Sequence, residues 1–157
     1  MTAKQSRLVE IDWPDFGGGE RPPPASLEEF EVRVGTLRAA MDRRRLSHVV
    51  VYGDREHFAN LTYLTNFDPR FEEAVLIVAA AASQPLLVVG NECEGYLTVS
   101  PLFVAGKLRA ERFQPFSLLN QPRQSSRLIR DIFAGEGVAT GSTVGCASWI
   151  RPIRPGV

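Results

Sequence analysis

Short apolar runs along the chain predict six β-strands. The runs at 48–52, 74–79 and 85–90 hold almost no polar residue, which is typical of strands buried on both faces of a sheet. The predicted strands are 48–52, 74–79, 85–90, 102–105, 112–116 and 143–147.

The clearest helical pattern begins after Ser26. Ser26 and Glu29 form a capping box, in which each side chain accepts a hydrogen bond from the other residue's free backbone N–H. Arginines at 43–45 fall in the last turn, where positive charge opposes the helix dipole. A solvated helix end explains this arginine run, and an anion site is the alternative. The apolar face of the helix comprises Leu27, Phe30, Val34, Leu37 and Met41.

Two further helices complete the pattern. Asp54 is predicted to cap a short helix that carries Phe58, Leu61 and Leu64 at helical spacing. A helix over 124–133 ends at Gly135 and Gly137. Its predicted inward residues are Leu128, Ile129, Ile132 and Phe133. The order of helices and strands predicts an α/β domain with a mixed sheet covered by helices.

The two ends of the chain differ from this pattern. Residues 1–25 are predicted to form an extension, because glycine and proline clusters punctuate them. Within it, Ile11, Trp13 and Phe16 are apolar enough to lie against another subunit or loosely against their own domain. Residues 148–157 are rich in proline and arginine, have no periodicity and are predicted to form an irregular tail. The domain itself is predicted to span 26–147.

Composition limits the possible classes of protein. The 157 residues suffice for one sizeable core, and 44% of them are hydrophobic and 23% charged. The formal net charge is zero, which gives no support for a nucleic-acid or membrane partner. No signal peptide or membrane-spanning run is present, so we expect a cytoplasmic protein. Cys93 and Cys146 are predicted to be free, buried thiols.

Candidate chemistry gathers around the loop that precedes the strand at 74–79. Phe67, Asp68, Arg70 and Phe71 combine aromatic and charged side chains between two core elements, where scaffolds of this kind place function. Asp68, Glu72 and Glu73, with the acids of 91–96, could form a metal or acid–base cluster. No histidine lies near them at a ligand-like spacing, so we predict ordinary solvated carboxylates and no metal.

The segment 60–67, NLTYLTNF, carries a family likeness. It resembles the N-x-x-Y-L-T-G-F segment in the N-terminal domain of the creatinase and aminopeptidase P (Xaa-Pro dipeptidase) family. Asn66 stands where that family usually has glycine. The order of the surrounding elements agrees with the likeness, which covers roughly residues 26–147.

The resemblance implies a fold and a supporting role. The fold would be a ribonuclease-H-like α/β domain with a mixed sheet of about six strands. In that family a separate pita-bread domain holds a dinuclear metal site built from two aspartates, a histidine and two glutamates, and none of these ligands maps onto this chain. The N-terminal domain builds subunit contacts and lends loop residues to the edge of an active site. Here the matching residues are Phe67, Asp68, Arg70 and Phe71, with Arg70 as the charged candidate for a carboxylate.

Family members continue past the strand that resembles residues 141–145 into the catalytic domain. The resemblance therefore implies a truncated member, or one whose catalytic half is encoded separately, acting as a homo-oligomer or with a separate catalytic domain. The alternative is a free-standing binding or regulatory module for a small carboxylate or a protein partner. A hydrolase in its own right is the least favoured, because His48 and His57 are its only possible imidazole bases.

Overall fold

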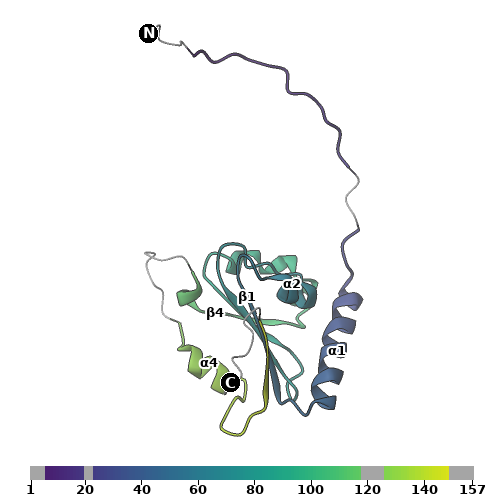
Figure 1. The fold of residues 1–157 in the computed structure, drawn as a ribbon, viewed down its shortest axis with the longest axis vertical. Coiled ribbons are helices and arrows are strands. Elements are labelled where there is room, and N and C mark those ends of the chain that lie inside the picture. Colours follow the sequence, from purple (N-terminus) through teal and green to yellow (C-terminus); the bar gives the residue numbers. More distant parts are fainter. Residues whose placement is uncertain (1–5, 20–22, 118–125, 149–157) are drawn as a thin grey trace, which may run out of the picture.

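A five-stranded mixed sheet lies at the centre of the domain, with helices on both faces (Figure 1). The structure is a computed structural model that describes residues 6–19, 23–117 and 126–148. It confirms the α/β class and the mixed sheet, with five strands in this part of the chain where about six were expected. The strands are β1 His48–Gly53, β2 Ala74–Ala79, β3 Leu86–Val89, β4 Arg109–Arg112 and β5 Val144–Ala147.

The strands lie in the order β4-β3-β2-β1-β5. The antiparallel pairing of β1 with β2 runs from His48 opposite Ala79 to Gly53 opposite Ala74. The pair β2–β3 is also antiparallel, whereas the outer strands β4 and β5 run parallel to their neighbours β3 and β1. All residues of β2 and β3 are buried, as expected for central strands covered on both faces.

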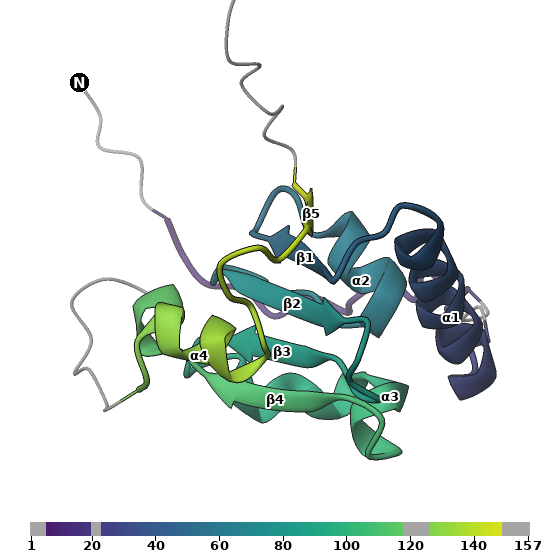
Figure 2. The same ribbon diagram turned by 90° about the horizontal axis from the view of Figure 1, so that it is seen from below.

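Two apolar layers hold the helices against the sheet. Figure 2 shows the sheet with α1 and α2 on one side and α4 on the other. On one face, Phe30 and Met41 of α1 pack with Leu61 of α2 over inward residues of β1 and β2. On the other, Ile132 of α4 packs against Val75 and other residues of β2 and β3. The helices are α1 Leu27–Arg43, α2 Ala59–Thr65, α3 Pro101–Val104 and α4 Ile129–Gly135, with 3₁₀ turns η1 Glu94–Val99 and η2 Gln114–Phe116.

Helix α1 begins where the capping pattern predicts. The Ser26 side chain accepts a hydrogen bond from the backbone N–H of Glu29 at 3.3 Å. The Glu29 carboxylate instead pairs with Arg33 one turn on, at 2.9 Å. The serine half of the capping box is therefore present, and the glutamate stabilises the helix surface.

The predicted cap of α2 is wrong. The Asp54 carboxylate accepts hydrogen bonds from the N–H groups of Glu56 and His57 at 2.8 and 2.7 Å, and closes a turn before the helix. Helix α2 begins only at Ala59, and Phe58 occupies its N-cap without a side-chain hydrogen bond. The sequence signal for a cap was real, but the aspartate caps an Asx turn.

The strand predicted at 102–105 is a helix. Ser100 caps α3 by accepting from the N–H of Phe103 at 3.4 Å, and Pro101 occupies the first turn. Leu102 is buried while Val104 is 69% exposed, which is the pattern of a helix surface. Four apolar residues are too few for periodicity to separate a helix from a strand.

Two other predicted elements are shifted along the chain. The strand expected at 112–116 is a 3₁₀ turn that contains Pro115, and the strand β4 lies just before it. The β4 sequence RAER is polar because this edge strand is partly exposed, so hydrophobic patterning misses it. Within the predicted helix 124–133, residues 124 and 125 lie outside the described residues, and the helix starts at Ile129. Leu128 is its extended N-cap and is exposed, not inward.

The Asp54 turn makes the free energy of unfolding depend on pH. Partial burial opposes the charged form, but the backbone N–H groups of Glu56 and His57 and the His57 ring together lower the pKa of Asp54 below its usual 3.8. A carboxylate with a lowered folded pKa stabilises the fold above its unfolded pKa, and this contribution is lost as pH falls through the folded pKa.

Asp54→Asn is therefore expected to destabilise the protein by about 1 kcal/mol or less near neutral pH, since the side chain is partly exposed. The difference from the native protein should shrink as pH falls from about 6 to about 2. Urea unfolding across this range measures it, and Glu56→Gln is the control for loss of a carboxylate in the same turn. A difference that stays constant with pH would contradict the assignment.

Candidate functional site

The predicted site loop, residues 67–71, starts at the left-handed end of α2. Asn66 has a φ of 61°, and its side-chain Nδ2 donates a 2.7 Å hydrogen bond to the carbonyl oxygen of Val99. Glycine adopts this conformation without strain, and asparagine tolerates it better than other residues. Asparagine can therefore stand where the resemblance implies glycine and still form the same turn.

Phe67 anchors the start of the loop in the core. Its side chain is fully buried, and its ring lies 5.8 Å from the ring of Tyr96 between centroids. Its backbone N–H donates to the Thr65 hydroxyl at 3.1 Å, and its carbonyl accepts from the Thr62 hydroxyl at 3.0 Å. Phe67 thus fixes the loop from beneath, and its ring does not face solvent.

Asp68 shapes the tip of the loop. Its carboxylate accepts a 2.8 Å hydrogen bond from the backbone N–H of Arg70, which has a φ of 60°. The N–H of Glu72 then donates to the carbonyl of Pro69 at 3.0 Å and closes a turn. Arg70 is exposed, and Phe71 is 49% exposed. Of the four predicted site residues, Arg70 and Phe71 are therefore exposed, Asp68 is half-buried and Phe67 is buried.

Glu72 anchors the other end of the loop with a buried carboxylate. The side chain is 2% exposed. Its two oxygens accept hydrogen bonds from the backbone N–H groups of Glu92 and Cys93, at 3.2 and 2.9 Å. Charge-assisted hydrogen bonds of this kind are stronger than neutral ones and offset part of the cost of burying a charge. Glu72 therefore ties the loop to the chain that leaves β3.

The Glu72 carboxylate can reach the N–H groups of Glu92 and Cys93 only because a glycine follows β3. A Cβ atom on Gly90 would lie 2.4 Å from the Glu72 carboxyl carbon, which is closer than real contacts allow. The carboxylate cannot move aside without losing its two N–H partners. Sequence reasoning placed Glu72 among solvated loop acids and gave Gly90 no such role.

Cys93 completes the link between the two segments. Its thiol donates a 3.1 Å hydrogen bond to the carbonyl of Pro69, beneath the tip of the loop. Burial, together with the neighbouring Glu72 carboxylate, raises the pKa of Cys93 to about 12. A thiol with this pKa is inert as a nucleophile at neutral pH, so its role is structural. Cys146, in contrast, is exposed on the edge strand β5, which corrects the prediction that it is buried.

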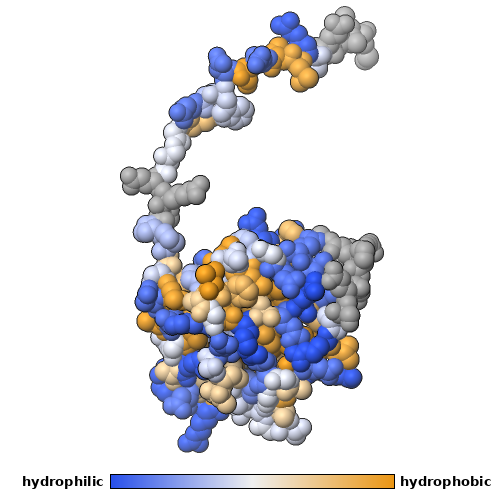
Figure 3. All heavy atoms as spheres, turned by 180° about the vertical axis from the view of Figure 1, so that it is seen from behind, coloured by the Kyte–Doolittle hydropathy of each residue, from blue (hydrophilic) through white to orange (hydrophobic). Residues whose placement is uncertain are grey.

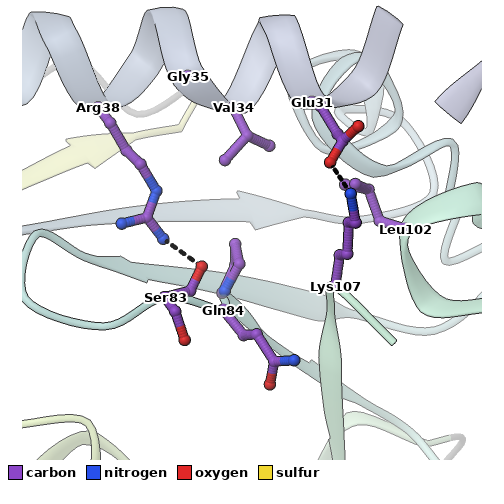
Figure 4. Close-up of a pocket in the computed structure, with 9 residues that line it drawn as sticks. Glu31, Val34, Gly35, Arg38, Ser83, Gln84, Leu102 and Lys107 are labelled. Carbon is purple, nitrogen blue, oxygen red and sulfur yellow. Dashed lines mark hydrogen bonds and ion pairs between the residues drawn. The ribbon is translucent and has the colours of Figure 1, made fainter. Parts of the chain in front are cut away.

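A pocket of about 390 Å³ lies away from this loop, between α1 and the turn that joins β2 to β3 (Figure 4). Arg38 reaches down from α1 and donates to the carbonyl oxygens of Ala79 and Ser83 at 3.3 and 3.2 Å. At the other end of the pocket, Lys107 forms an ion pair with Glu31. The charged groups of this pocket already have partners within the chain, so we assign the pocket a role in packing α1 against the sheet and not in binding a ligand.

The acidic residues near the loop do not converge. Within the ranges that the structure describes, no three His, Cys, Asp or Glu side chains are placed to hold a metal ion. Glu72 turns inward to backbone N–H groups, and Asp68 accepts from Arg70. The described part of this chain therefore does not fit the dinuclear metal site of the resembled family.

Among the described helices, none has the length and apolar character needed to cross a membrane.

No protein-family model matches the sequence. No curated protein matches it either. Solved structures with a similar fold are creatinase/prolidase N-terminal domains and Xaa-Pro peptidases. One is the N-terminal creatinase/prolidase-like domain of a protein from Corynebacterium diphtheriae, 16% identical over 75% of this chain and 94% of that one, with a TM-score of 0.45.

A proline dipeptidase from Streptococcus agalactiae is 18% identical over 78% of this chain and 95% of that structure, with a TM-score of 0.43. The dipeptidase PepE from Mycobacterium ulcerans is 19% identical over 54% of this chain, with a TM-score of 0.43. The match covers only 22% of the PepE chain. At these identities and TM-scores the likenesses establish neither an activity nor a substrate for this protein.

Gly90→Ala tests the contact between β3 and Glu72. We expect a loss of about 1–3 kcal/mol of unfolding free energy, because the added methyl group overpacks against a carboxylate that cannot move away. Gly95→Ala is the control, since a Cβ there meets no atom within 4 Å. Chemical denaturation of both variants gives the comparison.

A second background sharpens this test. In Glu72→Ala protein the cost of Gly90→Ala should fall, because the clashing carboxylate is absent. Equal costs in both backgrounds, or equal costs for the variants at 90 and 95, would contradict the proposed contact.

Proposed function

We propose that this chain is a non-catalytic domain of the creatinase N-terminal type, which serves subunit assembly and gates substrate at the edge of a metallohydrolase active site. The observation that carries the proposal is the backbone of Arg70. A left-handed backbone at a residue other than glycine costs about 1–3 kcal/mol and persists only where the surroundings impose it. Such strain is concentrated at ligand clamps and active sites.

The surroundings of Arg70 do impose this conformation. Phe67 is buried before it and Glu72 after it, and the Asp68 carboxylate holds its N–H at 2.8 Å. The exposed guanidinium takes part in no ion pair within the described residues. The backbone of Arg70 is therefore held in place, and its guanidinium is available to a carboxylate, which an arginine binds with two parallel hydrogen bonds. The exposed ring of Phe71 offers an apolar contact next to it.

The resemblance of the segment 60–67 favours a non-catalytic role for the domain. In the resembled family the metal ligands belong to another domain, and the described residues here hold no cluster that fits those metals. The two free cysteines support a reducing, cytoplasmic compartment. The expected partners are further copies of this chain or a separate catalytic domain.

A free-standing binding module is the second candidate. The exposed pair Arg70 and Phe71 favours it as well, because a small carboxylate or a protein partner can bind this loop without any catalytic domain. The two candidate functions predict different affinities of the isolated chain for its ligand. A gating loop supplies part of a site and binds a carboxylate weakly when alone, whereas a complete module binds its ligand tightly.

Titration of the ¹⁵N-labelled chain with the dipeptide alanyl-proline tests the role of Arg70. We expect weak binding, with amide shifts confined to residues 67–72. Arg70→Ala should weaken it at least about tenfold, since a charge-assisted pair contributes about 1.5–3 kcal/mol. Arg70→Lys should lie between, because it keeps the charge and loses the two-pronged geometry. Arg55→Ala, at another exposed arginine, is the control and should bind like the native chain.

Four outcomes would count against the proposal. Shifts outside the loop, or an affinity unaffected by Arg70→Ala, would remove Arg70 from the recognition of carboxylates. Release of proline by the chain in the presence of manganese would contradict a non-catalytic role. Tight, saturable binding to the isolated chain would favour the free-standing module.

A further inference from the structure

The segment of residues 6–19 carries large apolar side chains that its own domain leaves uncovered. This segment, the N-terminal arm, forms no helix or strand and runs clear of the domain (Figure 1). Trp13 is 81% exposed and Phe16 is 83% exposed. Apolar and polar residues lie side by side along the arm (Figure 3). Contiguous exposed apolar residues of this size indicate a surface that covers them.

The order of residues in the arm is that of an extended strand with one apolar face. Val9, Ile11 and Trp13 alternate with Glu10 and Asp12. Since successive side chains of a strand point to opposite faces, the three apolar residues share one face and the two acids the other. The arm is therefore suited to lie along a sheet edge beside an apolar groove.

The domain has such a groove, between α1 and the edge of the sheet formed by β1 and β5. Two adjoining hollows of about 270 and 290 Å³ make it up. They share Leu37 and Ala40 of α1, Val49 of β1 and Ala147 of β5. On the sheet side, Gly145 and Ala147 of β5 lie opposite Val49 and Val51 of β1, and the Leu46 side chain lies close over Gly145.

The edge beside the groove is open as well. Strand β5 is the last strand of the sheet and pairs only with β1 among the described residues. An edge strand offers unpaired N–H and C=O groups, and extended segments add to such edges through main-chain hydrogen bonds. Strand β5 has four residues and the alternating part of the arm, residues 9–13, has five, so the two segments are close in length.

The charges of the groove and the arm are complementary. Arg33 and Arg44 are the only charged residues among those that line the two hollows. Arg33 already pairs with Glu29, whereas Arg44 forms no ion pair within the described residues. The arm carries three carboxylates against one arginine: Glu10, Asp12, Asp15 and Arg7. Asp15 lies on the same face of an extended arm as Ile11 and Trp13, so its carboxylate is the one placed to approach Arg44 at this end of α1.

We infer that the arm of one copy of this chain lies in the groove of a second copy, with Ile11 and Trp13 against Leu37 and Ala147 and its backbone along β5. The partner is a second copy because the arm is exposed along its length and runs clear of its own domain (Figure 1). Reciprocal exchange of arms closes a two-fold dimer. This inference rests on the assembly part of the proposed function and is independent of the ligand of Arg70.

Cross-linking between two marked chains tests the inference. One full-length protein carries Asp12→Cys with Cys146→Ser, and the other is the native chain labelled with ¹⁵N. In the inferred arrangement, residue 12 and Cys146 lie on the same face of the sheet, opposite the groove. Cys93 is buried and has a raised pKa, so it does not compete for the reagent. A short bis-maleimide is added to the mixture, and intact mass identifies the products.

We expect a cross-linked pair that contains one chain of each mass. Adding Ile11→Ala and Trp13→Ala to the first protein should lower its yield at least about fivefold, since these side chains anchor the arm. Adding Val104→Ser, at an exposed apolar residue of α3 outside the groove, should leave the yield unchanged.

Two results would overturn the inference. An Asp12→Cys protein with native Cys146 that cross-links within one chain, and not between chains, would place the arm in its own groove. Absence of both products would show that the arm does not lie beside β5. Sedimentation of the native chain and of the variant with Ile11→Ala and Trp13→Ala separates failure of this inference from failure of the proposed function. A dimer that persists in the variant assembles by another surface, whereas a native chain that is a monomer does not assemble at all.

Discussion

The buried carboxylate of Glu72 holds together the two segments on which the candidate site depends. It accepts hydrogen bonds from the N–H groups of Glu92 and Cys93, and it lies where any side chain on Gly90 would collide with it. A buried charge is costly unless hydrogen bonds satisfy it, so this arrangement is tolerated only in one geometry. The loop that precedes β2 is fixed to the end of β3 as a result.

Fixing both ends of the loop explains how it can carry strain at its tip. Phe67 is buried at one end and Glu72 at the other, so the short stretch between them has few conformations left. Arg70 takes a left-handed backbone there, with its N–H bound to Asp68 and its guanidinium exposed. A domain built in this way fixes the backbone from which the exposed Arg70 side chain extends into solvent. This suits a role in recognition, and the described residues offer no group of side chains placed to bind a metal.

Much of the fold was predictable because the central strands and α1 have strong local signals. The run 74–79 is apolar throughout and matches β2, and Ser26 begins α1 as its capping pattern predicts. Edge elements were not predictable, since β4 is polar and the apolar run at 102–105 becomes helical through its Ser–Pro cap. The loop was chosen as the candidate site from its composition, and its role stays a prediction. The role of Glu72 was not predictable, because its partners lie about twenty residues away and only the fold brings them together.

Amide hydrogen exchange at Glu92 and Cys93 in the full chain tests the central claim most directly. Neither residue belongs to a strand, so no sheet hydrogen bond protects either amide, and loss of the Glu72 carboxylate should speed the exchange of both. If the carboxylate holds them, they should be protected to a degree approaching that of β3, and Glu72→Gln should lose much of this protection. Rapid exchange in the native chain, like that of the open position Gly95, would contradict the account.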